Sequence, residues 1–279
     1  MALTKRQNVS LLPSTRFLLT KTAPRVILGA VLFLFVATSF SFSMFQPEYN
    51  RQYFSLTTQS PHFKAYYPKR EKAKIPEILS VAESSYTQIT QIFPNKIPSI
   101  NILVISSVKD CNKLFGRYHK TAKWITGQYN WNAITIINPR DKYRNKTIAH
   151  EMVHVFIWDI SRNTPNWLNE GLAQYISKSN FNTNMKNNEL DVAVRLHKLF
   201  SLAELNKPFD SFSTQHDVHL AYREAFSVTD FMIREFGLPK VVEFVLLRKQ
   251  ANELGDDIKQ VFGLSYEAFE AQWLNSLKY

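Results

Sequence analysis

The chain has 279 residues, of which 45% are hydrophobic, and its formal net charge is +11. This content of apolar residues suffices for a buried core and excludes an intrinsically disordered protein. The single cysteine, Cys111, excludes an intramolecular disulfide and a zinc finger built on cysteines.

The positive charge is unevenly distributed along the chain. Five basic residues precede the first acidic one, which leaves 29 basic against 23 acidic residues in the remainder. That remainder holds no compact basic run interleaved with aromatic residues, so we expect no nucleic-acid partner.

The N-terminal region has the pattern of a membrane-insertion signal. Residues 26–44 (VILGAVLFLFVATSFSFSM) carry no charge, and 19 residues of helix cover about 29 Å, close to the thickness of a bilayer's hydrocarbon core. Because basic residues are retained on the cytoplasmic side, we expect a cytoplasmic basic segment at 1–25 and a transmembrane signal anchor at 26–45. The rest of the chain would then be extracytoplasmic in a single-pass protein of the cell membrane.

A cleaved signal peptide is the alternative interpretation of the same segment. Small residues at Ala37 and Ser39, or at Ser41 and Ser43, could mark a cleavage site, and the domain would then be secreted. An extracytoplasmic chain without paired cysteines is typical of bacteria.

The first part of the globular region alternates strands with helices. Residues 46–61 read as a linker running into a first strand, and a domain follows at 62–279. Apolar periodicity predicts strands at 62–67 and 99–106, helices at 78–93 and 109–118, and a hairpin of 124–129 with 133–138.

From Lys142 onward the pattern predicts only helices. They are expected at 143–160, 165–178, 189–203, 217–236, 239–250, 256–262 and 265–277. Capping and stop signals support these limits, namely Thr164 before Pro165, Gly237 with Pro239, Asp256, and Ser265. The expected fold class is therefore α+β, with a small mixed strand and helix N-terminal lobe, an all-helical C-terminal lobe, and one N-terminal transmembrane helix.

The segment HEMVH carries the first chemical signal. In a helix, His150 and His154 lie one turn apart on one face and can present two imidazole nitrogens to one metal. Glu151 lies one step round the helix, beside the metal, where a carboxylate can take a proton from water. By itself the motif could equally hold satisfied core polar groups.

A second signal lies sixteen positions after His154, where Glu170 occurs in WLNEGLA on the next predicted helix. A catalytic zinc takes three protein ligands and one open position, and two histidines with a glutamate form a standard set. A short connection between antiparallel helices can bring Glu170 to the same ion.

HEMVH followed by WLNEGLA resembles the gluzincin metallopeptidases, and most closely the thermolysin-like "peptidase MA-like" domains of bacteria. The resemblance covers roughly residues 52–277. It implies a zincin-like metallopeptidase domain, Zn²⁺ bound by His150, His154 and Glu170, and Glu151 as general base. Two departures stand out: the gap before the glutamate is shorter than in thermolysin, and no GxMEN-like segment precedes HEMVH, which favours an endopeptidase over an aminopeptidase.

The predicted reaction is hydrolysis of peptide bonds in a peptide or protein substrate by zinc-activated water. A second donor to the oxyanion is expected from the helical lobe. Tyr222 is the candidate and His219 its rival, and ordinary packing is the alternative for both. Asn169 could orient a metal ligand or be a surface amide.

Three further interpretations stay open. The strand 133–137 could pair with an extended substrate or lie inside the sheet. The chain could be a catalytically inactive, membrane-anchored zinc-binding or interaction module, which leaves the intact Glu151 without a purpose. It could also be a membrane-anchored protein that binds polyanions, with binding that depends strongly on salt.

Overall fold

The computed structural model describes residues 50–115, 127–130, 133–178 and 188–277. The predicted basic segment at 1–25 and the predicted anchor at 26–45 lie outside these residues. Within the described ranges, no helix combines the length and the apolar character needed to cross a bilayer.

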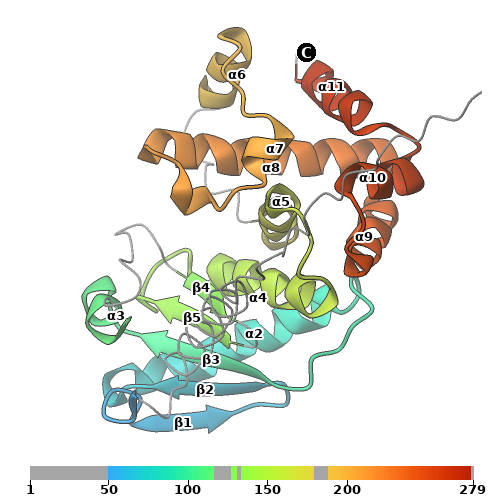
Figure 1. Ribbon diagram of the computed structural model, residues 1–279. Helices are drawn as coiled ribbons and strands as arrows, with labels where there is room; N and C mark the ends of the chain where they lie inside the picture. Colours follow the sequence, from blue (N-terminus) through green and yellow to red (C-terminus); the bar gives the residue numbers. More distant parts are fainter. Residues whose placement is uncertain (1–49, 116–126, 131–132, 179–187, 278–279) are drawn as a thin grey trace, which may run out of the picture. The chain divides into compact units, whose positions relative to one another are not determined.

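A mixed sheet forms the first lobe (Figure 1). Its strands are β1 (Leu56–Gln59), β2 (Phe63–Tyr67), β3 (Ile100–Ile105), β4 (Gly127–Asn130) and β5 (Ala133–Ile137). Their order is β1-β2-β3-β5-β4, in which β2, β3 and β5 run parallel while β1 and β4 are antiparallel to their neighbours. Since β5 lies between β3 and β4, it is an interior strand, and the hypothesis that residues 133–137 pair with a substrate is wrong. Among the strands that the structure describes, the edge on this side is β4.

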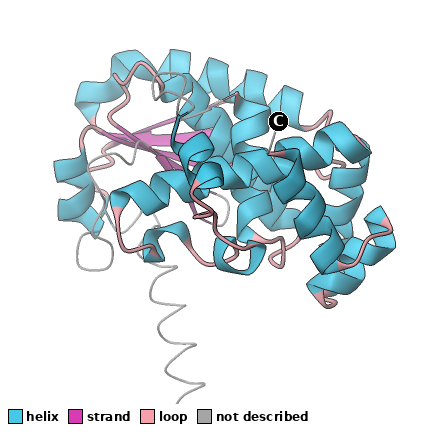
Figure 2. Cartoon of the chain, turned by 90° about the horizontal axis from the view of Figure 1, so that it is seen from above, coloured by secondary structure: helices cyan, strands magenta, loops and turns pink. Residues whose placement is uncertain are grey.

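Helices cover both faces of the sheet, as Figure 2 shows. Alternate residues of β2, β3 and β5, such as Ala65, Ile102 and Ile134, belong to the main core together with α2 (Ile75–Ile89) and α4 (Arg144–Ile160). Residues of the opposite parity, such as Leu103, pack in a second cluster with α3 (Val108–Phe115). Because successive side chains of a strand point to opposite faces, one set of alternate residues packs against α2 and α4 and the other against α3. Helix α4 therefore lies directly on one face of the sheet.

The second lobe is helical in the residues that the structure describes. It consists of α5 (Asn166–Ser177), α6 (Asn188–Arg195), α7 (Leu202–Leu205), α8 (Gln215–Phe236), α9 (Leu238–Leu247), α10 (Leu254–Phe262) and α11 (Tyr266–Ser276). Short 3-10 turns lie at η2 (Lys69–Lys74), η3 (Phe209–Ser211) and η4 (Arg248–Gln250). Trp167 and Trp273 are fully buried, and Trp273 Nε1 donates to Ser227 Oγ at 3.1 Å. One continuous core joins this lobe to the sheet through α4 and α5.

Several predicted boundaries are confirmed. Ser265 caps α11 by accepting from the backbone N–H of Ala268, and Gly237 ends α8 with a φ of 82°. The latter lies in the left-handed region that glycine adopts at little cost.

Three boundary predictions are wrong for local reasons. Thr164 does not cap α5, because Pro165 is the extended residue before the helix and the Thr164 hydroxyl donates to Ser161 O instead. Asp256 lies in the first turn of α10, which begins at Leu254. The helix expected at 189–203 ends at Arg195, and a separate capping box between Ser201 and Glu204 begins α7.

Candidate metal centre

Helix α4 carries HEMVH in a position that is buried on nearly every side. The helix packs against α2, the sheet and α5. His150 and His154 are only 3% and 2% exposed, and Glu151 is 8% exposed. Polar groups are costly in such surroundings unless they find partners, so these three side chains call for a specific partner.

The two imidazoles and the Glu170 carboxylate converge on one point. His150 Nε2 lies 3.2 Å from His154 Nε2, and Glu170 Oε2 lies 3.6 Å from each of these nitrogens. The Glu170 Oε2 atom is buried and has no hydrogen-bond partner in the described part of the chain. Each of the three residues thus turns a potential ligand atom towards the other two.

These separations fit a tetrahedral zinc site. Ligands at about 2.0–2.1 Å from a tetrahedral centre lie roughly 3.3 Å from one another. The separations of 3.2, 3.6 and 3.6 Å lie close to this value. Two nitrogens with one carboxylate oxygen are also a donor set that zinc uses in enzymes. The residues present therefore fit the metal that the sequence predicts.

Helix α5 supplies one candidate ligand and orients the other two. The amide oxygen of Asn169 accepts a hydrogen bond from His154 Nδ1 at 3.0 Å, and His150 bonds to the backbone of Ala173. Histidine ligands of metals commonly donate their second ring N–H in this way, which fixes the tautomer and the direction of the ring. The geometry of Asn169 is therefore that of a residue that positions a ligand.

Gly171 explains how α5 is held in place. A Cβ atom at this position would lie 2.0 Å from Thr229 Oγ1 and 2.4 Å from the backbone oxygen of Ala225, both on α8. Only glycine allows the two helices to approach so closely. One turn further, Gln174 Nε2 donates to the backbone oxygen of Tyr222 at 2.8 Å. Sequence reasoning overlooked Gly171, although a glycine inside a predicted helix is itself a signal.

Burial and the charges of neighbouring side chains shift the pKa values of the four groups in different directions. The groups are His150, Glu151, His154 and Glu170. Burial lowers the pKa of His154 to about 4, which leaves its imidazole neutral at pH 7. Burial also opposes ionisation of Glu170, but the nearby His154 and His150 outweigh it, so the pKa of Glu170 is lowered. A neutral imidazole and an ionised carboxylate are the forms that bind metals.

For Glu151, burial outweighs the effect of the neighbouring imidazole on the pKa. Burial raises the pKa of its carboxyl to about 7, with His150 opposing this shift and Glu170 adding to it. A group whose pKa lies near neutral pH can both accept and release a proton. For His150, the carboxylates of Glu170 and Glu151 outweigh the effect of burial, and its pKa is raised.

The ring of Tyr222 packs against the core of the helical lobe. Its ring meets Phe209 edge-on, with 4.9 Å between the ring centroids, and the side chain is half-buried against the main core. Its assignment as an oxyanion donor stays a prediction.

A comparison with known families matches the part of the chain that contains α4 and α5. The model of the peptidase MA superfamily matches residues 109–279, more than half of the chain, and this segment includes α4 and α5. The match begins within α3, so it is shorter at its N-terminal end than the resemblance at 52–277. No curated protein matches the chain.

Proposed function

Since the chain belongs to the peptidase MA superfamily, we propose that it is a membrane-anchored zinc metallopeptidase that hydrolyses peptide bonds within a peptide or protein. The observation that carries this proposal is the convergence of His150 Nε2, His154 Nε2 and Glu170 Oε2 in a buried site. Glu151 beside them supports an enzyme over an inactive zinc-binding module, because a purely structural site has no need of a base.

In the proposed mechanism, His150, His154 and Glu170 hold the zinc ion. When bound, zinc polarises the scissile carbonyl and lowers the pKa of water towards about 7. Glu151 takes the proton of the attacking water and delivers it to the nitrogen of the leaving amine. Its pKa of about 7 suits both steps. Asn169 holds the His154 ring in register with the other two groups.

The substrate would bind as an extended strand along β4. Among the described strands, β4 lies at the edge of the sheet, and it packs beside α4. Edge strands offer backbone groups that can pair with an added strand. An internal segment of a longer chain fits such an open edge, and no GxMEN-like segment precedes HEMVH to bind a free amino terminus. Both features favour an endopeptidase.

The uncharged stretch at 26–44 and the basic residues before it support an uncleaved anchor, with the catalytic domain extracytoplasmic. Alkaline phosphatase fused after residue 61 tests this topology. We expect an active fusion that stays in the membrane fraction, and an inactive fusion would contradict the proposed orientation.

Glu151→Gln tests the proposed chemistry most cleanly. Glutamine keeps the shape of the side chain but cannot accept the proton, so hydrolysis of a fluorogenic peptide library should fall about 10²–10⁴-fold. The bound zinc should remain, because Glu151 is not among the three proposed ligands. An active variant would refute the general-base assignment.

Tyr222→Phe separates the oxyanion hypothesis from packing. If the hydroxyl stabilises the transition state, kcat falls by about 10²-fold or more with unchanged zinc content and unfolding temperature. His219→Ala is the matched comparison. An unchanged kcat in Tyr222→Phe, together with a reduced one in His219→Ala, transfers the role to the rival residue.

A further inference from the structure

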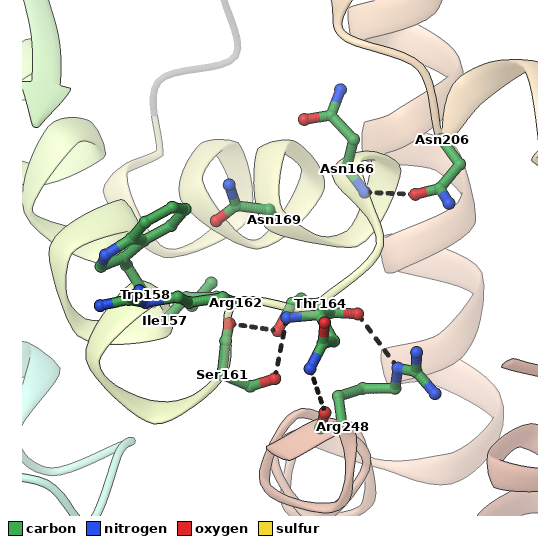
Figure 3. Close-up of a pocket in the computed structure, with 10 residues that line it drawn as sticks. Ile157, Trp158, Ser161, Arg162, Thr164, Asn166, Asn169, Asn206 and Arg248 are labelled. Carbon is green, nitrogen blue, oxygen red and sulfur yellow. Dashed lines mark hydrogen bonds between the residues drawn. The ribbon is translucent and has the colours of Figure 1, made fainter. Parts of the chain in front are cut away.

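A polar pocket opens where α4 turns into α5 (Figure 3). Its volume is about 420 Å³, in the range that small ligands occupy. The walls come from the end of α4, the loop at 161–164, the first turns of α5, the end of α7 and η4. The pocket shares one residue with the candidate metal centre, Asn169.

The lining of this pocket favours a negatively charged occupant. Among the described residues that line it, none is acidic, and two are the arginines Arg162 and Arg248. Arg162 is exposed and lies over the Trp158 ring, 5.2 Å from its centroid. The apolar part of the lining is limited to Trp158 and Ile157.

The Arg248 guanidinium is held rigidly at one side of the pocket. Its Nε donates to the Asn163 backbone oxygen at 3.1 Å, and its Nη1 donates to the Asn252 backbone oxygen and to the Asp257 carboxylate. Asp257 neutralises part of the charge, and these contacts leave Nη2 without a hydrogen bond to any residue the structure describes. A donor that is already fixed loses little entropy when a ligand binds.

Two asparagines add further donors and one acceptor. Asn206 Oδ1 accepts from the backbone N–H of Asn166 at 2.8 Å (Figure 3). Asn166 Nδ2 donates to the Lys207 backbone oxygen at 2.9 Å. Within the described part of the chain, this leaves the amide N–H groups of Asn206 and the amide oxygen of Asn166 for a ligand. N–H donors from Asn206 and Arg248 suit an oxyanion.

We propose that this pocket binds the carboxylate or phosphate group of a small anionic ligand. On the described lining, a cation would meet two guanidinium groups and no carboxylate, and an apolar ligand would bury amides without partners. The inference goes beyond the proposed function, because binding here requires neither zinc nor hydrolysis.

Inorganic phosphate is the first probe, titrated calorimetrically into the purified full-length chain at constant ionic strength, with chloride as the competing anion. Phosphate can also bind to zinc, so the titration is made on the chain as purified and after removal of metal. We expect saturable binding in both states. Binding that disappears with the metal, or no saturable binding at all, would overturn the proposal.

Two variants assign the binding to the pocket. Asn206→Asp keeps the oxygen that accepts from Asn166 but replaces the amide donors with a negative charge. Arg162→Gln removes an exposed cation that lies on Trp158. Each should raise the Kd for phosphate about tenfold or more. Arg234→Gln, which removes another exposed arginine, is the control. Equal affinity in all three variants would contradict the assignment.

Competition then identifies the source of the oxyanion. Displacement of phosphate by a short peptide with a free C-terminal carboxylate, but not by its C-terminal amide, would assign the pocket to a peptide end. Displacement by citrate and by neither peptide would assign it to a free small anion.

Discussion

Two buried carboxyl groups of the helical lobe, Glu170 on α5 and Glu224 on α8, show what distinguishes a ligand site from a packing site. Glu224 is fully buried, and one of its oxygens accepts from the backbone N–H of Phe200 at 3.0 Å. Its other oxygen has no hydrogen-bond partner among the described residues. Burial raises the pKa of Glu224 to about 8, against the effect of the Phe200 N–H and with the help of Glu204.

Burial opposes the ionisation of Glu170 as well, but this carboxyl group faces two imidazoles, and its pKa is lowered instead. Burial alone therefore produces a neutral carboxyl group, whereas burial beside basic nitrogens produces an anion ready to bind a cation. The proposed zinc site depends on this difference, and the following changes test it in order of decreasing effect.

Removing one imidazole should make the surroundings of the Glu170 carboxyl group more like those of Glu224, which has no basic nitrogen beside it among its named contacts. The free energy of zinc binding to a site with four ligands is about 10–16 kcal/mol, so each ligand contributes roughly 3 kcal/mol. Loss of one ligand in His154→Ala should therefore weaken zinc binding by about two orders of magnitude. Competition with a chromogenic chelator measures this affinity. His216→Ala, at an exposed histidine on α8, is the control and should bind zinc as the wild type does.

Gly171→Ala should disturb the helix that carries Glu170. The added methyl group would meet Thr229 and the Ala225 backbone, and overpacking of this kind costs about 1–3 kcal/mol of unfolding free energy. Denaturant unfolding of the metal-free chain measures the loss. Gly255→Ala is the matched control, because its Cβ would have an ordinary contact at 3.6 Å with Tyr266. Equal stability of the two variants would show that α5 and α8 do not need the close approach.

Asn169→Ala should weaken zinc binding without removing a ligand. Loss of a group that orients a metal-binding histidine typically costs about 10–100-fold in affinity. The same chelator competition measures it, and Asn166→Ala on the same helix is the comparison. If Asn169→Ala binds zinc like the wild type, the hydrogen bond to His154 does not position the ring.

Glu224→Gln should change how stability depends on pH. The folded-state pKa of about 8 lies above the ordinary value of 4.5, so the folded chain holds a proton that the unfolded chain releases. This contribution is fully present below pH 4.5 and is lost as the pH rises to about 8, with a slope of at most about 1.4 kcal/mol per pH unit.

The difference in unfolding free energy between wild type and Glu224→Gln, measured across this range, isolates the effect from other titrating groups. A difference that stays constant with pH would mean that Glu224 is ionised in the folded protein.

The sequence predicts the α4–α5 region well because its signals are local. Spacing within one helix places His150 and His154 together, and a short connection restricts where Glu170 can lie. Helix limits were also accurate where a capping residue acts within its own turn, as at Ser265.

Features set by distant contacts were not predictable in this way. The interior position of β5 depends on pairing with β3 and β4, which the alternation within 133–137 does not encode. By contrast, the end of the helix at Arg195 goes with a local signal that was overlooked, because Ser201 and Glu204 form a capping box only three residues apart. The burial of Glu224 with a single hydrogen-bond donor among the described residues depends on the backbone of Phe200, 24 positions away. These contacts join segments whose order in space follows from the whole fold.

The most direct test of the proposed site is the zinc content of the full-length chain, purified without chelators and measured by plasma mass spectrometry beside His154→Ala. We predict one zinc ion per wild-type chain and a large loss in the variant. A wild-type chain that contains no zinc, or a variant that retains it fully, would contradict the assignment of His150, His154 and Glu170 as its ligands.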